Sequence, residues 1–217
     1  KKETVSFSTI YRGIKTGILG VTEKEVLVRK GKVTPRNTEE TRGKISDRKG
    51  IEERPAEANE RTEIGHFELD TVIGKSKNGA ILTCVDRASR YLIGSLMEDR
   101  KANTLSNALI EKFKEIPLGK RKTFTSDNGK EFARFKDYEE VLGMPNYFAN
   151  PYHSWERGTN EQTNGILRRY FPKGTDFSSL TKSVVDEVII RINLMPKKCL
   201  GWLTPFEVFW KKSLQLT

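Results

Sequence analysis

The chain has 217 residues, of which 35% are hydrophobic and 31% charged, so it is long enough and apolar enough to build a folded core. Its 39 Lys and Arg outnumber its 29 Asp and Glu, and the net charge of +10 favours a polyanionic partner. Cys84 and Cys199 are too few for a disulfide framework, and no apolar run is long enough to span a membrane. These features exclude a disulfide-stapled secreted domain and a membrane protein, and they predict a soluble protein of a reducing compartment.

Residues 1–55 form a basic N-terminal segment, with 14 Lys and Arg against 8 Asp and Glu, and so supply +6 of the net +10. Residues 5–14 predict a short amphipathic helix with a Ser cap. We interpret the segment as the end of a helix-turn-helix DNA-binding region followed by a linker arm. A solvated basic tail is the alternative for residues 29–49. The candidate DNA contacts in this arm are Arg29, Lys30, Lys32, Arg36, Arg42, Lys44, Arg48 and Lys49.

Residues 56–217 show the alternating elements of an α/β domain. Runs of alternating apolar residues predict three consecutive antiparallel strands, and two further short strands are separated by helical patterns. The predicted strands are residues 66–73, 80–85, 91–97, 122–125 and 147–149, and the predicted helices are residues 102–116, 131–142, 159–170, 180–194 and 205–213. This order predicts a mixed sheet flanked by helices.

Two acidic residues stand where strands would hold them. Asp70 lies in the middle of the first predicted strand, where β-propensity disfavours Asp. Asp127 follows a later strand directly and precedes the turn signal Asn128-Gly129. Each has an ordinary explanation when taken alone, because Asp70 could face solvent and Asp127 could serve only the turn.

A third acidic residue, Glu161, lies in the first turn of a predicted helix. Thr159 and Gln162 have the spacing of a capping box at that helix start. Asn164 and Arg168 follow Glu161 at i+3 and i+7, so the three side chains share one helix face. On this face Glu161 could bind a metal, Asn164 could position it and Arg168 could contact a phosphate. Alternatively, the face is an ordinary polar surface.

The sequence around these three acids resembles the three blocks of DDE transposases. The blocks are GHFELDTVIG at residues 65–74, TSDNGKEF at 125–132 and PYHSWERGTNE at 151–161. They are most similar to the insertion-sequence-thirty family, a relative of the retroviral integrases, and the likeness runs over residues 8–209. The resemblance implies an RNase H-like integrase catalytic core with a mixed five-stranded sheet. It also implies that Asp70, Asp127 and Glu161 meet at one edge of that sheet as catalytic residues and metal ligands.

The resemblance further implies a transposase that cuts the ends of a mobile element and joins the resulting 3′-hydroxyl to target DNA. Two divalent ions, Mg²⁺ or Mn²⁺, would assist the nucleophile and the leaving oxygen. The expected partners are terminal inverted repeats, target DNA and further copies of the chain assembled on DNA, in the bacterial cytoplasm at the nucleoid. Two alternatives stay open: a nuclease of the same fold that does not join DNA, and an inactive DNA-binding inhibitor of transposition.

Other acids and both histidines compete for roles in such a site. We rank Glu68, Asp86 and Glu156 below the three block residues. His66 and His153 are the only histidines, and a His-based metal site would need further ligands close to both. We therefore expect structural or positioning roles for the two histidines.

Overall fold

The computed structural model describes residues 5–26, 45–75, 79–151 and 153–213. The chain divides into two compact units, Lys1–Arg42 and Gly43–Thr217. In the first unit, α1 (Phe7–Lys15) begins after Ser6, whose hydroxyl accepts a hydrogen bond from the Thr9 N–H at 3.3 Å. The short helix α2 (Glu23–Val26) follows. The predicted helix with its Ser cap is thus confirmed.

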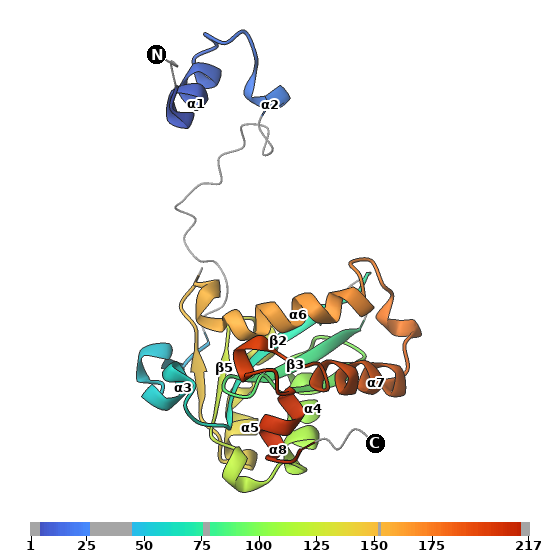
Figure 1. The fold of residues 1–217 in the computed structure, drawn as a ribbon. Helices are drawn as coiled ribbons and strands as arrows, with labels where there is room; N and C mark the ends of the chain where they lie inside the picture. Colours follow the sequence, from blue (N-terminus) through green and yellow to red (C-terminus); the bar gives the residue numbers. More distant parts are fainter. Residues whose placement is uncertain (1–4, 27–44, 76–78, 152, 214–217) are drawn as a thin grey trace. The chain divides into compact units, whose positions relative to one another are not determined.

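The second unit is built on a mixed six-stranded sheet with the strand order β1-β6-β5-β2-β3-β4 (Figure 1). Strands β2, β3 and β4 form an antiparallel meander, whereas β5 lies parallel to β2, and β6 and β1 continue the parallel half. The strands are β1 (Lys49–Gly50), β2 (His66–Ile73), β3 (Ala80–Asp86), β4 (Leu92–Met97), β5 (Thr123–Ser126) and β6 (Asn146–Phe148).

Helices cover both faces of this sheet. They are α3 (Ala56–Glu60), α4 (Ala102–Lys114), α5 (Phe135–Leu142), α6 (Gly158–Tyr170), α7 (Lys182–Asn193) and α8 (Pro205–Trp210). Short 3₁₀ turns connect them, among them η1 (Ile51–Glu53), η3 (Lys130–Phe132) and η4 (Ser154–Arg157). No helix in the described parts of the chain is both long and apolar enough to cross a membrane.

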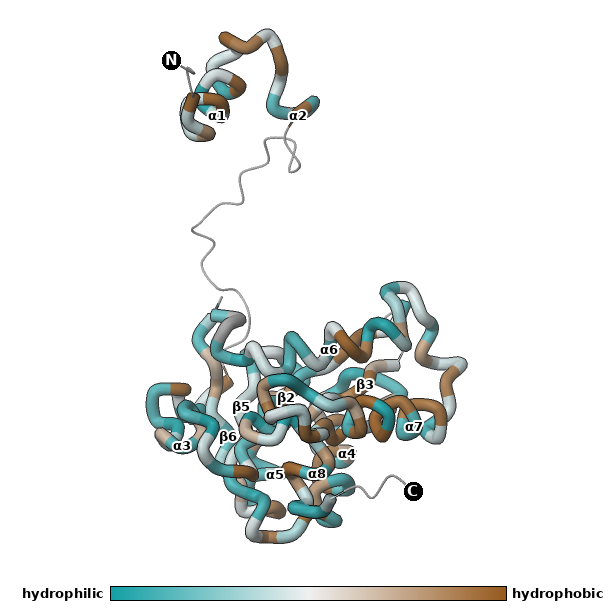
Figure 2. Tube along the Cα trace, in the orientation of Figure 1, coloured by the Kyte–Doolittle hydropathy of each residue, from teal (hydrophilic) through white to brown (hydrophobic). Residues whose placement is uncertain are grey.

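Two hydrophobic cores lie on opposite faces of the sheet. The first core joins Phe67 and Leu69 of β2 to side chains of α4, α5 and α8. The second joins Val72, the next apolar residue on β2 but on its other face, to side chains of α6 and α7. Hydrophobic residues accordingly recur along α7 in Figure 2. Because both faces of β2 are covered, a polar side chain on this strand needs a partner or an opening to solvent.

The structure corrects the predicted elements in two places. The sheet has a sixth strand, β1, which residues 49–50 add in parallel to β6. Lys49 and Gly50 carry no apolar alternation, so only the pairing with β6 reveals this strand. The helix predicted for residues 131–142 is divided into η3 and α5. The division follows from Glu131, which turns inward to bond the side chains of Thr71 and Arg100.

Residues 45–55 therefore lie within the second unit, although the boundary was predicted after residue 55. Ile45 packs against the first core, and Ile51 and Arg54 are buried. Arg54 donates to the Thr125 hydroxyl at 3.1 Å, which ties this segment to β5. Residues 45–49, the part of the predicted linker arm that the structure describes, thus belong to the folded core.

Candidate active site

Asp70 and Asp127 lie just beyond the stretch over which β2 and β5 pair in parallel. Glu68 of β2 is in register with Thr125 of β5, and two further residues along each strand lead to Asp70 and Asp127. The Asp70 carboxylate accepts hydrogen bonds from the Thr71 N–H at 2.8 Å and from the Asn164 side-chain amide at 2.9 Å. Parallel pairing thus brings together two acids that lie far apart in the sequence.

Arg157 links the two carboxylates. Its guanidinium lies 3.7 Å from Asp70 Oδ1 and 3.2 Å from Asp127 Oδ2, and it also donates to the Leu69 carbonyl at 3.1 Å. Its side chain is only 14% exposed. Arg157 was not among the predicted site residues, and the signal that could have found it is its place just before the helix that carries Glu161. A buried cation therefore lies between the two acids.

The electrostatics of Asp70 reflect this crowding. Burial raises the pKa of Asp70, and the negative charges of Asp127 and Glu131 act in the same direction. Arg157 and the Thr71 N–H oppose the shift because they stabilise the carboxylate. The surroundings of Asp70 therefore favour a cation beside its carboxylate and disfavour a further anion there.

Asp127 also serves the turn that its sequence suggested. Its Oδ1 accepts a hydrogen bond from the Gly129 N–H at 2.8 Å, as in an Asx turn. Its side chain is 41% exposed, and its Oδ2 faces Arg157. The two explanations considered for Asp127 are therefore compatible, since one oxygen holds the turn while the other faces Arg157.

Glu161 lies in the first turn of α6 with an exposed side chain. Asn164, one turn further along α6, contacts Asp70 and so brings this face of the helix toward β2. Within the described residues, no three His, Cys, Asp or Glu side chains are grouped closely enough to hold a metal ion. The structure thus joins Asp70 and Asp127 around Arg157, and it gives the Glu161 carboxylate no contact with either.

The capping box predicted for α6 is wrong. The helix begins at Gly158 with Arg157 as its N-cap, and no side chain of its own caps it. Thr159 is buried inside the first turn, where its hydroxyl accepts a hydrogen bond from Arg90 at 3.3 Å. A carboxylate from β2 takes the place of the cap, because Glu68 accepts the Asn160 N–H at 2.8 Å.

Arg168 lies at the other end of α6. Its guanidinium donates to the Ile73 carbonyl at 2.8 Å and to the Phe171 carbonyl at 3.5 Å. Burial lowers the pKa of this guanidinium. Arg168 therefore fastens α6 to the end of β2 in this structure, and a contact with DNA would need its remaining N–H groups.

Most of the predicted DNA-contacting arm lies outside the described residues, namely Arg29, Lys30, Lys32, Arg36, Arg42 and Lys44. Arg48 and Lys49 are described and exposed. The Arg48 guanidinium hydrogen-bonds the side-chain carbonyl of Asn128, the residue that follows Asp127. Arg48 is thus the arm residue that the structure brings beside the acids.

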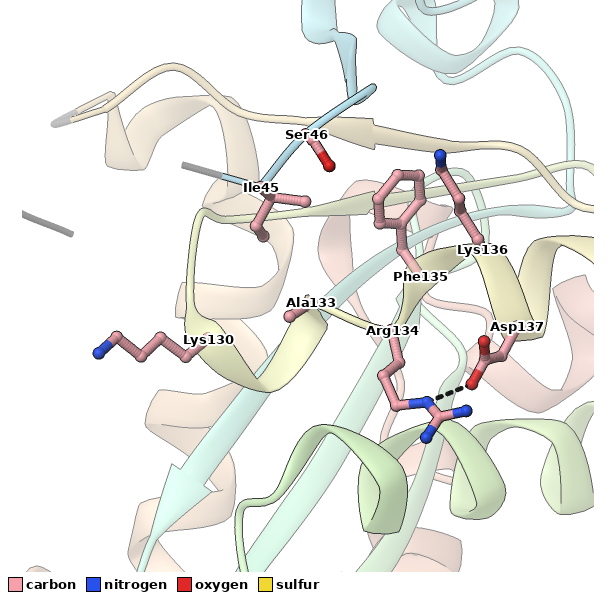
Figure 3. Close-up of a pocket in the computed structure, with 8 residues that line it drawn as sticks. All are labelled: Ile45, Ser46, Lys130, Ala133, Arg134, Phe135, Lys136 and Asp137. Atoms are coloured by element: carbon pink, nitrogen blue, oxygen red, sulfur yellow. Dashed lines mark hydrogen bonds and ion pairs between the residues drawn. The ribbon is translucent and has the colours of Figure 1, made fainter. Parts of the chain in front are cut away.

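A shallow pocket opens beside η3 and α5 (Figure 3). Its basic side chains are largely neutralised, since Arg134 pairs with Asp137 and Lys136 pairs with Asp47. The described residues that line it are Ile45, Ser46, Lys130, Ala133, Arg134, Phe135, Lys136 and Asp137. Because none of the three block acids lines this pocket, the candidate site is the carboxylate pair around Arg157.

The competing acids and His66 are bound within the protein. Glu68 is paired with Arg87, and Asp86 accepts the Gly65 and Ser89 N–H groups at 2.7 Å. Glu156 accepts the Asn150 N–H at 2.8 Å. His66 is 3% exposed and hydrogen-bonds Thr123 at 2.8 Å, which fits a structural role.

Comparisons with known proteins agree with this fold. Residues 60–154 match the integrase core domain family, a range that contains Asp70 and Asp127. The computed structure resembles the crystal structure of the catalytic core domain of BIV integrase, with a TM-score of 0.53 and 15% identity, over 69% of this chain and 95% of that one. This likeness shows a retroviral-integrase type of fold, so the predicted RNase H-like architecture is confirmed.

Sequence relatives are transposases of insertion sequences. The chain is 40% identical over 77% of its length to the transposase for insertion sequence element IS4351 of Bacteroides fragilis, and covers 51% of that protein. It is 39% identical over 77% of its length to transposase InsI for insertion sequence element IS30A of Escherichia coli strain K12, and covers 43% of that protein. The chain thus spans about half the length of these curated relatives. Over 77% of its length the chain is similar to these insertion-sequence transposases, and residues 60–154 match the integrase core domain family.

Proposed function

We propose that this chain is the catalytic part of a DNA transposase that cleaves and joins DNA strands with the help of divalent metal ions. The observation that carries the proposal is the guanidinium of Arg157, which lies between Asp70 of β2 and Asp127, the residue that follows the adjacent parallel strand β5. It marks a position where two carboxylates accommodate a cation. Asp70, Asp127 and Glu161 are the proposed catalytic carboxylates.

The residues around this position fit a hard divalent ion. Mg²⁺ and Mn²⁺ prefer oxygen ligands, and Asp70, Asp127 and Glu161 would supply carboxylates from three separate elements. Asn164 Oδ1 is buried without a hydrogen-bond partner among the described residues, and its amide nitrogen already bonds Asp70. Two bound ions would supply activation of the attacking hydroxyl and stabilisation of the leaving oxygen.

The protein's own residues would hold the acids and the DNA. Asn164 orients Asp70 through its amide, and the Gly129 N–H orients Asp127. Arg48, beside Asn128, is suited to a phosphate contact because its exposed guanidinium can release the Asn128 side-chain carbonyl and donate two hydrogen bonds to a phosphate instead. The remaining basic residues of the arm, with Lys49 and Arg168, are proposed as further backbone contacts.

The partners follow from the same proposal. Terminal inverted repeats and target DNA are the proposed substrates, and a homo-oligomer on DNA would bring two element ends together. The site of action would be chromosomal DNA in the bacterial cytoplasm. Residues 1–55 are proposed as the DNA-contacting segment, of which residues 45–55 also form part of the folded core.

The decisive experiment incubates the chain with labelled DNA from the element's ends, a target duplex, and Mg²⁺ or Mn²⁺, and analyses each strand separately. The parent should give both cut and joined products. Glu161→Gln should give neither, because the loss of one anionic ligand removes catalytic stabilisation worth several kcal/mol. Glu156→Gln is the matched control, since Glu156 lies just before the same helix but bonds Asn150.

The possible results separate the alternatives. Cut strands without joined strands would indicate a metal-dependent nuclease on this fold. Binding of DNA without any product would indicate an inhibitor of transposition. Parent-like cutting and joining by Glu161→Gln would remove Glu161 from the site.

A further inference from the structure

Glu68 is a carboxylate that the proposed chemistry does not use, and it is completely buried. It lies on β2 two residues before Asp70, so both side chains leave the same face of the strand. Asp70 is partly open to solvent at 31%, whereas Glu68 is covered by the start of α6. Burying a carboxylate is costly unless it is paired and hydrogen-bonded, so the partners of Glu68 reveal what it holds.

Its first partner is the N-terminus of α6. Glu68 Oε2 accepts the Asn160 N–H at 2.8 Å, inside the first turn of a helix that has no side-chain cap of its own. The N-terminal N–H groups of a helix carry partial positive charge, which favours an anion at this end. Glu68 therefore fastens α6 to β2 at the residue immediately before Glu161.

Its second partner is Arg87, which follows β3 and pairs with the other carboxylate oxygen. Arg87 also donates to the Glu156 carbonyl at 3.2 Å and to the Ala58 carbonyl at 2.6 Å. The Glu68–Arg87 pair thus holds the chain on both sides of the junction between η4 and α6. The entry into the helix is fixed to the central strands of the sheet.

Glu161 consequently lies between two attachments to β2. Asn160 bonds Glu68 on one side, and Asn164 bonds Asp70 on the other, while the Glu161 carboxylate itself is exposed. We infer that Glu68 is a positioning residue that sets the place of Glu161 relative to Asp70. This inference rests on the proposed function, because it assumes that Glu161 and Asp70 serve one metal site.

A binding measurement without DNA tests the inference. The full 217-residue chain is titrated with Mn²⁺, and free Mn²⁺ is followed by electron paramagnetic resonance. Glu68→Gln keeps the side-chain volume and an acceptor oxygen but loses the charge that pairs with Arg87. Because it should let the start of α6 shift, we expect about tenfold weaker Mn²⁺ binding, as for other losses behind a metal ligand.

The matched control is Asp86→Asn. Asp86 is an equally buried carboxylate that also accepts backbone N–H groups, but its described hydrogen-bond partners are Gly65 and Ser89, neither of which belongs to α6. The melting temperatures of both variants are measured, and the titration is made well below the lower of the two. Asp86→Asn should bind Mn²⁺ within about twofold of the parent, since its site is independent of α6.

A double-mutant cycle separates positioning from general loss of structure. Glu161→Gln alone should weaken Mn²⁺ binding, and adding Glu68→Gln should weaken it no further, because the carboxylate that Glu68 positions is gone. If Glu68→Gln does not fold, Glu68→Asp, which keeps the charge on a shorter side chain, replaces it in every comparison and should show a smaller loss.

The outcomes distinguish this inference from the proposed function. If Glu161→Gln weakens Mn²⁺ binding but the Glu68 variant binds like the parent, Glu68 does not position Glu161 and the inference alone is overturned. Equal losses from the Glu68 variant with and without Glu161 would also overturn it. If Glu161→Gln binds Mn²⁺ like the parent, the metal assignment itself fails and the inference fails with it.

Discussion

At the scale of single residues, Arg157 sets the electrostatic environment of Asp70 and Asp127. Without a bound metal, its guanidinium is the cation that offsets the repulsion between Asp70 and Asp127. A divalent ion placed between the same carboxylates would compete with it. The salt bridge should therefore stabilise the metal-free protein and weaken metal binding at the same time.

We accordingly predict that Arg157→Gln lowers the melting temperature of the metal-free protein by several degrees, because a loss of about 1–2 kcal/mol shifts the transition by that much in a chain of this size. Added Mg²⁺ should then stabilise the variant more than the parent, since a ligand of the folded state raises stability with its affinity. Arg100→Gln is the control, because Arg100 pairs with Glu131 and bridges neither acid. An equal Mg²⁺ response in parent and Arg157→Gln would show that the arginine does not occupy the metal's place.

His66 gives a prediction about pH. Burial lowers its pKa, although the neighbouring Glu63 and Asp86 raise it and Lys122 lowers it further. Since the folded pKa lies below the unfolded value of about 6.5, the neutral ring stabilises the fold fully above that pH. This contribution is lost as the pH falls below the unfolded pKa and through the folded one.

The test compares melting temperatures of the parent and His66→Asn between pH 7.5 and 5, a window of about the width over which the ring titrates. Asn keeps a polar group near Thr123 but does not titrate. The parent should lose more stability than the variant on acidification. Burial is the main cause of the raised pKa of Asp86 and is common to both proteins, whereas the smaller opposing contribution of His66 is present in the parent alone. If the melting temperatures of the two proteins fall in parallel with pH, either the ring stays neutral throughout or its protonation does not destabilise the fold.

Single residues also show where the sequence was sufficient. The three blocks implied that Asp70, Asp127 and Glu161 meet, and helix spacing put Asn164 on the face of Glu161. The structure brings Arg157 to both Asp70 and Asp127, and it bonds Asn164 to Asp70. Arg157 and Glu68 could not be given their roles, because both act on groups presented by other elements of the fold. Likewise, Arg168 was expected to face DNA, and its bonds to the Ile73 and Phe171 carbonyls emerge only when α6 is laid against β2.

At the scale of elements, the packing of α7 on β4 depends on one small residue, Gly94. A Cβ placed on Gly94 would lie 2.7 Å from Ile189 Cδ1 and 3.0 Å from the Leu82 carbonyl oxygen. The helix therefore approaches the strand where the strand has no side chain. Asn193 completes this contact, as its amide both donates to and accepts from the Leu92 backbone at 2.8 Å.

We predict that Gly94→Val destabilises the protein by about 1–3 kcal/mol, the usual cost of overpacking, measured as a loss in the free energy of urea-induced unfolding. A Gly119→Ala variant serves as control, because a Cβ there would meet nothing within 4 Å. Unfolding curves of Gly94→Val that overlay those of the parent would mean that α7 can move away from β4 at no cost.

Elements were predicted well where packing and local pattern agree. All five predicted strands are present, with no end moved by more than one residue. The capping box at Thr159 failed because a carboxylate from another strand competes for the same N–H groups. The two-residue strand β1 was missed because it exists only through its pairing with β6. Local sequence patterns therefore fail to predict an element when residues far away in the sequence supply its hydrogen-bond partners.

The charge of the whole molecule is divided between its two units. Residues 1–42 hold 10 Lys and Arg against 5 Asp and Glu, so this unit carries +5 of the net +10. The folded core begins at Gly43, because Ile45, β1 and Arg54 pack on it. A truncation meant to remove the basic unit should therefore end at residue 42, and not at residue 55 as the sequence boundary implied.

We predict that deleting residues 1–42 leaves the melting temperature of the core close to that of the full chain, because those residues form a separate unit. The same deletion should flatten the dependence of log DNA affinity on log salt by about 0.9 for each duplex phosphate contact that is lost. Deleting residues 1–55 should flatten it further through the loss of Arg48 and Lys49, and should also lower the melting temperature, because β1, Ile51 and Arg54 are removed from the core. Binding isotherms on a duplex of unrelated sequence at several salt concentrations measure the slope. If the slope for the chain lacking residues 1–42 equals that of the full chain, the basic N-terminal unit is a solvated tail, and the phosphate contacts come from the core alone.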